Sequence, residues 1–362
     1  MEGRKGGVKE TDQEVECRPL VELAPHERYT LSNYDKVKKF KYLSLSHPLL
    51  INVMDSMTHY LCPHNGVPII VLAGVSGVGK SWLLEEILPG VVAQKDYRKP
   101  GGIIYVEAPA IGEQRMMLKA FYTLILRAGY EPLIDKKVGM IVKSGRLLLE
   151  RNSRGPTARV LFESIKSMFQ CRQHLALAID EVLHLLRFHE MEPMMDMLKS
   201  LARDDCPKLI VVGDFNVTER ARSYEQYVRR GRTIFFPRYD HAMAELKLAG
   251  ERKHRQDMVL AQYLSILSKI KAHWPWPDCM DVDHYCPELL WHSLGNMGLL
   301  KQIMASCLVK QNDNGGEWDN GFLKRSYLPA LQRASLVAAF EKNETEMAKF
   351  DCLGEPAEFP TQ

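Results

Sequence analysis

One octapeptide constrains this chain more than any other feature: residues 74–81 read GVSGVGKS and fit the pattern G-x-x-x-x-G-K-S. It directly follows an apolar run, Val67–Ala73, and precedes a helix-forming stretch that begins at Trp82. The glycines let the backbone surround phosphate oxygens with N–H groups, and the N-terminus of the next helix adds positive charge. The order strand, phosphate loop and helix therefore predicts a nucleotide-binding α/β domain.

The chemistry of this loop assigns its side chains. Lys80 is expected to reach the β and γ phosphates, and the Ser81 hydroxyl is expected to bind Mg²⁺. The residues predicted to hold the nucleotide are Gly74, Val75, Ser76, Gly77, Val78, Gly79, Lys80, Ser81 and Trp82.

Short apolar runs predict a parallel sheet. They are Val67–Ala73, Gly102–Val106, Leu175–Ile179 and Leu209–Val212, with Thr233–Phe236 as a candidate fifth strand. Runs that are apolar on both faces are typical of strands covered by helices on each side. Helical patterns stand between or beside them at His47–Cys62, Ser81–Leu88, Gln114–Ala128, Thr157–Phe169 and Glu192–Arg203. The fold class predicted is α/β, with a parallel five-stranded sheet.

The strand pattern ends near residue 240, and the remaining apolar residues have helical spacing. At 362 residues the chain exceeds one ordinary domain. We expect a flexible arm and basic extension at 1–44, the P-loop α/β domain at 45–240, a smaller α-helical domain at 241–340 and a flexible tail at 341–362. The helices expected in the third part are Ala242–Ala249, Gln256–Ala272, Pro287–Ser293 and Met297–Val309.

Two acidic residues, Asp180 and Glu181, follow the apolar run Leu175–Ile179. Because a parallel sheet binds ligands at the carboxyl edge of its strands, both carboxylates are expected beside the phosphate loop. Asp180 would then hold Mg²⁺ together with Ser81, and Glu181 would orient or deprotonate the attacking water. The alternative is a capping pair at a helix start.

Polar side chains also follow the next strand and surround the last one. Asp214 and Asn216 come just after Leu209–Val212; Asn216 is the easier contact for a γ phosphate because Asp214 would add negative charge, although either residue can simply cap a loop. Around the last strand, Arg229, Arg230 and Arg232 can form bidentate phosphate contacts, in a neighbouring subunit as well as in their own. A basic surface face is the alternative interpretation.

A P-loop, an Asp-Glu strand, a polar-tipped strand, an arginine cluster and trailing helices together resemble the AAA+ ATPases, with Gly298-Leu299-Leu300-Lys301 similar to their second sensor. Within that superfamily, His47-Pro48, Ile179-Asp180-Glu181-Val182-Leu183-His184-Leu185-Leu186 and Phe236-Pro237-Arg238-Tyr239 resemble the TniB/TnsC regulators of DNA transposition. The resemblance covers about residues 30–310.

The resemblance implies a Mg²⁺-dependent ATPase that assembles into rings or filaments on duplex DNA. It also implies that the protein marks a target site, recruits a transposase, works with a target-selection protein and disassembles when ATP is hydrolysed. Lys301 would contact the γ phosphate. Two alternatives stay open for this chain: an AAA+ replication helper or helicase loader, and a signalling P-loop NTPase that binds protein only.

A basic segment separates the second strand from the Asp-Glu strand. Between Lys136 and Arg159 seven basic residues face one glutamate, a local charge of +6 in a chain whose total is only +3. Such a patch can neutralise DNA phosphates without reading sequence, although a solvated basic loop is the alternative. The candidate DNA contacts are Arg115, Lys119, Lys136, Lys137, Lys143 and Arg146. A second basic run at Lys36, Lys38, Lys39 and Lys41 fits a phosphate-facing patch and a solvated surface equally well.

The remaining features concern compartment and metal. No run of apolar residues is long enough to cross a membrane, and the first residues lack the apolar core of a signal peptide, so a cytoplasmic protein is expected. Its eight cysteines contain no C-x-x-C pair and are most simply free thiols. Cys279, His284, Cys286 and His292 lie in one stretch, but their spacing matches no common zinc pattern.

Overall fold

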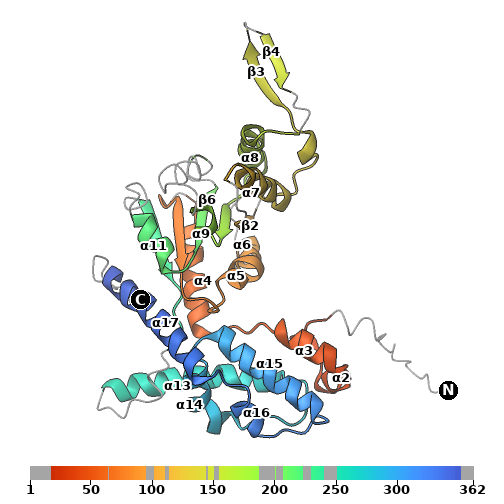
Figure 1. Ribbon diagram of the computed structural model, residues 1–362, viewed down its shortest axis with the longest axis vertical. Coiled ribbons are helices and arrows are strands. Elements are labelled where there is room, and N and C mark those ends of the chain that lie inside the picture. The colour runs from red at the N-terminus through yellow and green to blue at the C-terminus, as the bar shows by residue number, and fades with distance from the viewer. Residues whose placement is uncertain are drawn as a thin grey trace, which may run out of the picture. The chain divides into compact units, whose positions relative to one another are not determined.

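A computed structural model describes residues 18–63, 65–94, 102–110, 114–143, 146–150, 155–186, 200, 207–222, 230–239 and 251–351. The chain divides into two compact units (Figure 1). A helical unit combines the residues up to Pro48 with Arg238–Ala339, and an α/β unit combines Leu49–Pro237 with the residues from Phe340 onward.

The α/β unit is built on a five-stranded sheet in which every pairing is parallel. Its strands are β1 (Ile69–Ala73), β2 (Ile103–Glu107), β5 (Ala176–Asp180), β6 (Lys208–Gly213) and β7 (Gly231–Phe235), in the order β2-β5-β6-β1-β7. The five predicted apolar runs are therefore the five strands. The order places β6 between the strand that leads into the phosphate loop and the strand that ends in Asp180.

Helices α7 (Gln114–Ala128) and α8 (Ala158–Arg172) cover one face of this sheet. Ile125 of α7 and Ile165 of α8 are fully buried against Val71, Ile104 and other residues of the strands. On β1 the alternate residues Ile70 and Leu72 are also fully buried, so both faces of the central strand are covered. Burial on both faces explains why these strands read as continuous apolar runs and not as an alternating pattern.

The helix after the phosphate loop is interrupted. It consists of α5 (Lys80–Trp82), a π-helical turn η2 (Leu83–Ile87) and α6 (Leu88–Gln94). In the π turn the N–H of Leu88 donates to the carbonyl of Leu83, five residues earlier. Pro89 follows at once; it has no N–H to donate and its ring clashes with the carbonyl four residues before it, which accounts for the wider turn.

Three further helices of this unit precede or follow its strands. They are α4 (Pro48–Leu61), which precedes β1, α9 (Leu183–Leu186), which follows β5, and α11 (Phe215–Arg222), which follows β6.

The basic segment after α7 contains secondary structure that the sequence did not predict. A short turn, η3 (Ile134–Lys136), leads into β3 (Gly139–Lys143) and β4 (Arg146–Glu150), which pair antiparallel as a two-stranded sheet. Lys143 lies opposite Arg146 in this register.

The helical unit corrects one expectation. Residues 18–44, predicted as part of a flexible arm and basic extension, form η1 (Leu20–Glu22), α2 (Pro25–Thr30) and α3 (Asn33–Lys41). They belong to one compact unit with α13 (Glu251–Ala272), α14 (Val282–His292), α15 (Met297–Asp313), α16 (Gly321–Lys324) and the first part of α17 (Ala330–Asp351) (Figure 1).

Polar contacts hold this N-terminal segment in place. The buried guanidinium of Arg28 donates to the carbonyl of Ala272 at 2.6 Å, which satisfies the C-terminal end of α13. The ammonium of Lys36 lies 3.3 Å from the ring centroid of Trp276, and burial lowers the pKa of this lysine. A basic composition therefore hid side chains that pack inside the unit.

Several predicted boundaries shift. Helix α14 begins at Val282 and continues through Pro287, and α17 extends to Asp351, beyond the expected boundary at residue 340. The predicted helix Ala242–Ala249, nearly all of Glu192–Arg203, residues 1–17 and the tail from Cys352 lie outside the described residues. Among the helices that are described, none has the length and apolar character that crossing a membrane requires.

Candidate active site

The phosphate loop joins β1 to α5 at the carboxyl edge of the sheet. Gly77 and Gly79 have φ values of 86° and 106°, a region that favours glycine over residues with a Cβ. Gly79 also precedes α5, and its carbonyl accepts from the N–H of Leu83 at 2.9 Å, so the loop leads directly into a helix N-terminus. The loop therefore has the backbone form that its glycines predict.

Lys80 lies against the loop itself. Its ammonium donates to the carbonyl oxygens of Gly74 at 2.8 Å and Val75 at 3.0 Å. Burial lowers the pKa of Lys80, and the negative charges of Asp180, Glu181 and Asp214 oppose that shift. These three carboxylates are thus close enough to act on the loop lysine.

Asp180 accepts hydrogen bonds from three directions and is nearly inaccessible to solvent. Its Oδ2 accepts from the Ser81 hydroxyl at 2.5 Å and from the Tyr105 hydroxyl at 2.9 Å, while its Oδ1 accepts from the N–H of Glu181 at 2.8 Å. The two side chains predicted to hold Mg²⁺, 99 positions apart in the chain, are therefore in direct contact.

Tyr105 was not among the predicted site residues. It lies on β2, where Glu107 pairs with Asp180 on β5 and Tyr105 pairs with Ala178. Burial, followed by the charge of Asp180, raises the pKa of Tyr105, so its hydroxyl keeps the proton that it donates. The sequence signal was a single hydroxyl inside an otherwise apolar run, and it gave no indication of the partner.

Glu181 is exposed and has a φ of 51°, which is uncommon for a residue with a side chain. Its carbonyl accepts from the N–H of His184 at 2.9 Å, so the Asp-Glu pair also begins the turn into α9. The capping alternative therefore describes the backbone of Glu181, whereas the carboxylate of Asp180 faces the phosphate loop. Left-handed backbone at a non-glycine position is frequent at functional sites.

The strand β6 ends beside the loop, but its polar residues bond to each other. Asp214 accepts from the N–H of Asn216 at 3.0 Å and from the Asn216 side chain at 2.7 Å, at the start of α11. In this arrangement Asp214 caps the helix, and Asn216 belongs to the first turn of α11. The Asn216 side chain is exposed and donates to Asp214, and a contact of its amide with a γ phosphate stays a prediction.

Phe236 packs against the first residue of the phosphate loop. Its ring is almost fully buried, its N–H donates to the carbonyl of Ala73 at 2.7 Å, and a Cβ added to Gly74 would lie 2.6 Å from its carbonyl oxygen. Glycine at position 74 is thus required by close backbone approach. In the sequence, Phe236 stands out only as part of the Phe236-Pro237-Arg238-Tyr239 pattern.

The arginines lie on or next to the edge strand β7, which pairs with β1. Arg232 is half-buried and donates to the carbonyl of Gly231 at 2.9 Å, whereas Arg230 is exposed. Arg229 lies outside the described residues. Lys301 belongs to the helical unit, near the start of α15, where burial lowers its pKa; its approach to a nucleotide stays a prediction.

The candidate DNA contacts differ in what surrounds them. Lys119 and Lys136 are exposed, but Lys137 forms an ion pair with Glu131 at 2.7 Å. A Cβ added to Gly155 would lie 4.0 Å from the ammonium of Lys119, so α7 and the end of the basic segment come close together. The structure places Arg115 on α7, Lys143 on β3 and Arg146 on β4 by backbone alone.

The chemistry of the Ser81–Asp180 pair fits Mg²⁺, which prefers hard oxygen ligands and binds proteins through one or two carboxylates. No second metal site emerges in the described ranges, where no three His, Cys, Asp or Glu side chains gather. Cys279 and Cys286, considered as zinc ligands, carry free thiols, and burial raises the pKa of the Cys286 thiol to about 11.

No protein-family model matches the chain, and no curated protein sequence matches it. Among solved structures, the ADP form of the Aeropyrum pernix ORC2 protein is 12% identical, with 79% of this chain and 71% of that chain covered and a TM-score of 0.50. The ADPNP–ADP complexes of the same protein are 13% identical over the same shares, with a TM-score of 0.48. A Walker-type ATPase of Pyrococcus abyssi is 18% identical, with 82% and 75% covered and a TM-score of 0.45.

The likeness to the ADP form of ORC2 concerns the fold, and together with the all-parallel sheet it confirms the predicted class. The α/β unit has the fold of an AAA+ P-loop NTPase.

Proposed function

We propose that the chain is a Mg²⁺-dependent ATPase. The observation that carries this proposal is the contact of the Ser81 hydroxyl with the carboxylate of Asp180 at 2.5 Å, beside a phosphate loop that already holds the Lys80 ammonium. A P-loop NTPase binds Mg²⁺ through the loop Ser or Thr and an Asp at the end of a neighbouring strand. ADP in the similar ORC2 structure supports the same class of ligand.

The residues of this chain divide the work. Backbone N–H groups of Gly77–Lys80 bind the β phosphate, and Lys80 leaves its loop carbonyls to reach the γ phosphate. Bound Mg²⁺ would neutralise charge on the phosphate oxygens. Glu181 orients a water molecule and accepts its proton as the water oxygen bonds to the γ phosphorus and the bond to the bridging oxygen breaks, which gives ADP and phosphate.

Two substitutions test this assignment. Lys80→Ala should abolish binding of a fluorescent ATP analogue, whereas Glu181→Gln should keep binding and lower the turnover of ATP at least 100-fold. Glu85→Gln is the matched control, because Glu85 is exposed on the π turn after the loop. Unchanged ATP turnover in Glu181→Gln would refute the role of Glu181.

Beyond ATP hydrolysis, we infer a regulator of DNA transposition. The chain would assemble as a ring or filament on duplex DNA without reading sequence, mark a target site and recruit a transposase, and hydrolysis would drive disassembly. Support comes from the TniB/TnsC-like motifs, from Arg232 on the edge strand β7 with Arg230 just before it, and from the exposed lysines of α7 and the basic segment. An edge strand with Arg232 is a place from which an arginine can reach a neighbouring subunit.

DNA binding is tested with the exposed lysines. The double substitution Lys119→Gln with Lys136→Gln should weaken binding to duplex DNA about equally for all sequences and reduce the slope of affinity against salt concentration by about two. Lys137→Gln should have a smaller effect, since that side chain already pairs with Glu131. An unchanged salt slope in the double variant would place the DNA surface elsewhere.

The alternative from the same fold is a replication helper or helicase loader. Electron microscopy with duplex DNA and a slowly hydrolysed ATP analogue separates the two. Rings or extended filaments that form only in the presence of duplex DNA would support the transposition regulator. A species that stays monomeric under those conditions would refute it.

A further inference from the structure

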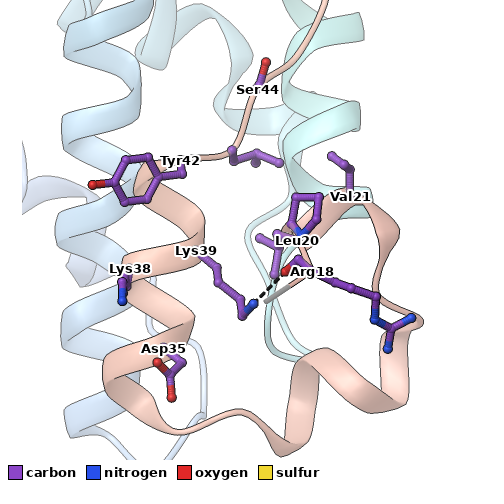
Figure 2. A pocket seen from close by; sticks show the side chains of 10 residues that line it. Arg18, Leu20, Val21, Asp35, Lys38, Lys39, Tyr42 and Ser44 are labelled. Atoms are coloured by element: carbon purple, nitrogen blue, oxygen red, sulfur yellow. Dashed lines mark hydrogen bonds between the residues drawn. The ribbon is translucent and has the colours of Figure 1, made fainter. Parts of the chain in front are cut away.

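A hollow lies in the helical unit, and none of its lining residues belongs to the phosphate loop, the Asp-Glu strand or the basic segment 136–159. It has a volume of about 510 Å³ and is lined by residues 18–21 on one side and by α3 with residues 42–44 on the other (Figure 2). Ligand pockets commonly have volumes of about 300–1,000 Å³. The hollow is therefore large enough for one or two large side chains together with some backbone.

Its walls are fixed by hydrogen bonds. Lys39 reaches across from α3, and its ammonium donates to the carbonyl of Arg18 at 2.6 Å, the contact drawn in Figure 2. Arg18 in turn pairs with Glu27 of α2 at 2.6 Å. Because Arg28 and Lys36 anchor α2 and α3 to the rest of the unit, the hollow is formed in advance and is not a gap in a mobile arm.

Several apolar and aromatic side chains that line the hollow are exposed to solvent. Leu20 and Leu43 are buried beneath the hollow, whereas Val21 is 44% exposed and Tyr42 79% exposed. Tyr34, also exposed, precedes Lys38 and Tyr42 at four-residue intervals, so an aromatic, a basic and an aromatic side chain follow one another on a single face of α3. Exposed tyrosine with aliphatic neighbours is typical of surfaces that bind a partner.

The charge of the lining selects the partner. Three cations, Arg18, Lys38 and Lys39, line the hollow with one carboxylate, Asp35; Arg18 already pairs with Glu27, and Asp35 accepts from the Ser32 hydroxyl at the start of α3. A partner that is acidic overall gains from Lys38, which is exposed. Asp35 and Ser44 are hydrogen-bond acceptors that a peptide backbone can satisfy with N–H groups, whereas a phosphodiester backbone offers acceptors only.

We propose that this hollow is a docking site for an acidic peptide segment of another protein. One large apolar side chain of that segment would enter between Val21 and Tyr42, and a flanking carboxylate would pair with the exposed Lys38. The site lies outside the nucleotide machinery, so binding requires neither ATP nor DNA.

The test uses the full chain and a phage-displayed library of random 12-residue peptides. The expected result is enrichment of sequences in which Asp or Glu flanks an aromatic residue or Leu. A synthetic consensus peptide, measured by fluorescence anisotropy, should bind at least tenfold more weakly to Val21→Glu and to Lys38→Glu, and more weakly as NaCl rises. Both substituted side chains are exposed, so the folded unit should keep its unfolding temperature.

Two controls separate this proposal from the others. Lys324→Glu makes the same charge change on α16 of the same unit, outside the lining, and should leave peptide binding unchanged. Lys80→Ala should also bind the peptide normally, so a failure of the ATPase proposal would leave this one standing. No enrichment, or enrichment of non-acidic peptides, would overturn the docking site.

Two competing occupants are tested in the same assay. If Lys38→Glu abolishes binding of a 20-nucleotide DNA strand while the consensus peptide binds both proteins equally, the surface is a nucleic-acid site and the proposal is wrong. A synthetic peptide of residues 8–17, VKETDQEVEC, is tested as a competitor of the consensus peptide. If its dissociation constant is lower than that of the consensus peptide, the occupant is this chain and the proposal is wrong.

Discussion

The hydroxyl of Tyr105 offers the sharpest test of the candidate site, because Tyr105→Phe removes one oxygen atom and leaves the ring. That oxygen donates at 2.9 Å to the same carboxylate oxygen of Asp180 that Ser81 contacts. A hydrogen bond to a charged group contributes about 1.5–3 kcal/mol. Asp180 keeps its bonds from Ser81 and from the N–H of Glu181, so we expect the lower end, about 1.5 kcal/mol of unfolding free energy.

The effect on magnesium is the more specific measurement. If Tyr105 fixes the orientation of the Asp180 carboxylate, its loss should raise the Mg²⁺ concentration needed for half-maximal binding of an ATP analogue. A free-energy difference near 1.4 kcal/mol corresponds to about a tenfold increase. Binding of the analogue without Mg²⁺ should change little, because the phosphate loop makes its contacts through backbone N–H groups and Lys80.

The assay pairs urea unfolding with a Mg²⁺ titration of nucleotide binding. Tyr130→Phe is the matched control, because Tyr130 is 89% exposed on the same unit and the same atom is removed. A Tyr105→Phe protein with an unchanged Mg²⁺ dependence would show that the tyrosine only packs against the strand. Loss of nucleotide binding with and without Mg²⁺ would instead contradict the separation of loop and carboxylate argued above.

Two predictions concern the stability of the helical unit. Gly295→Ala should cost more than about 3 kcal/mol, because Gly295 has a φ of 65° and its Cβ would lie 1.7 Å from the carbonyl oxygen of Tyr239; Gly315→Ala, with a φ of 68° and open space, should cost only about 1–2 kcal/mol, and equal unfolding free energies would refute the steric argument. Burial, followed by the charge of Lys269, lowers the pKa of His47 from 6.5 to about 4, so the unfolded chain binds the proton more tightly. Stability is then present above pH 6.5 and declines as the pH falls toward 4, by about 2 kcal/mol between pH 7.5 and 5.0. His47→Gln should flatten that part of the profile in urea unfolding, and an unaltered profile would assign the loss to other groups.

The strands and the phosphate loop were predictable because each depends on residues close together in sequence. The runs around Val71 and Ile179 are buried on both faces and therefore contain no polar residue. Such strands can be predicted from the local sequence without knowing which strands pair with them. The positive φ values of Gly77 and Gly79 are likewise predictable from the residue type alone.

Features that depend on a distant partner were missed. Tyr105 becomes part of the site only because β2 pairs with β5, and the sequence does not state that pairing. Lys36 belongs to a basic run that is typical of a protein surface, but it is buried against Trp276, which is 240 positions later in the chain. The hairpin β3–β4 was not predicted because the segment was interpreted by its charge. Its short apolar runs, 140–142 and 147–149, become strands only by pairing with each other.

The stretch Phe236–Tyr239 gives a physical meaning to a pattern that first served only as a resemblance. Its first residue supports the phosphate loop, with its N–H on the carbonyl of Ala73 at 2.7 Å. Its last residue belongs to the helical unit, where the N–H of Tyr239 donates to the carbonyl of Gly295 at 3.0 Å and its ring packs on His47. Only Pro237 and Arg238 separate these two anchors, and proline fixes its own φ. The pattern therefore spans the boundary between the two units at Pro237 and Arg238, and each of its outer residues is held within its own unit by a backbone hydrogen bond.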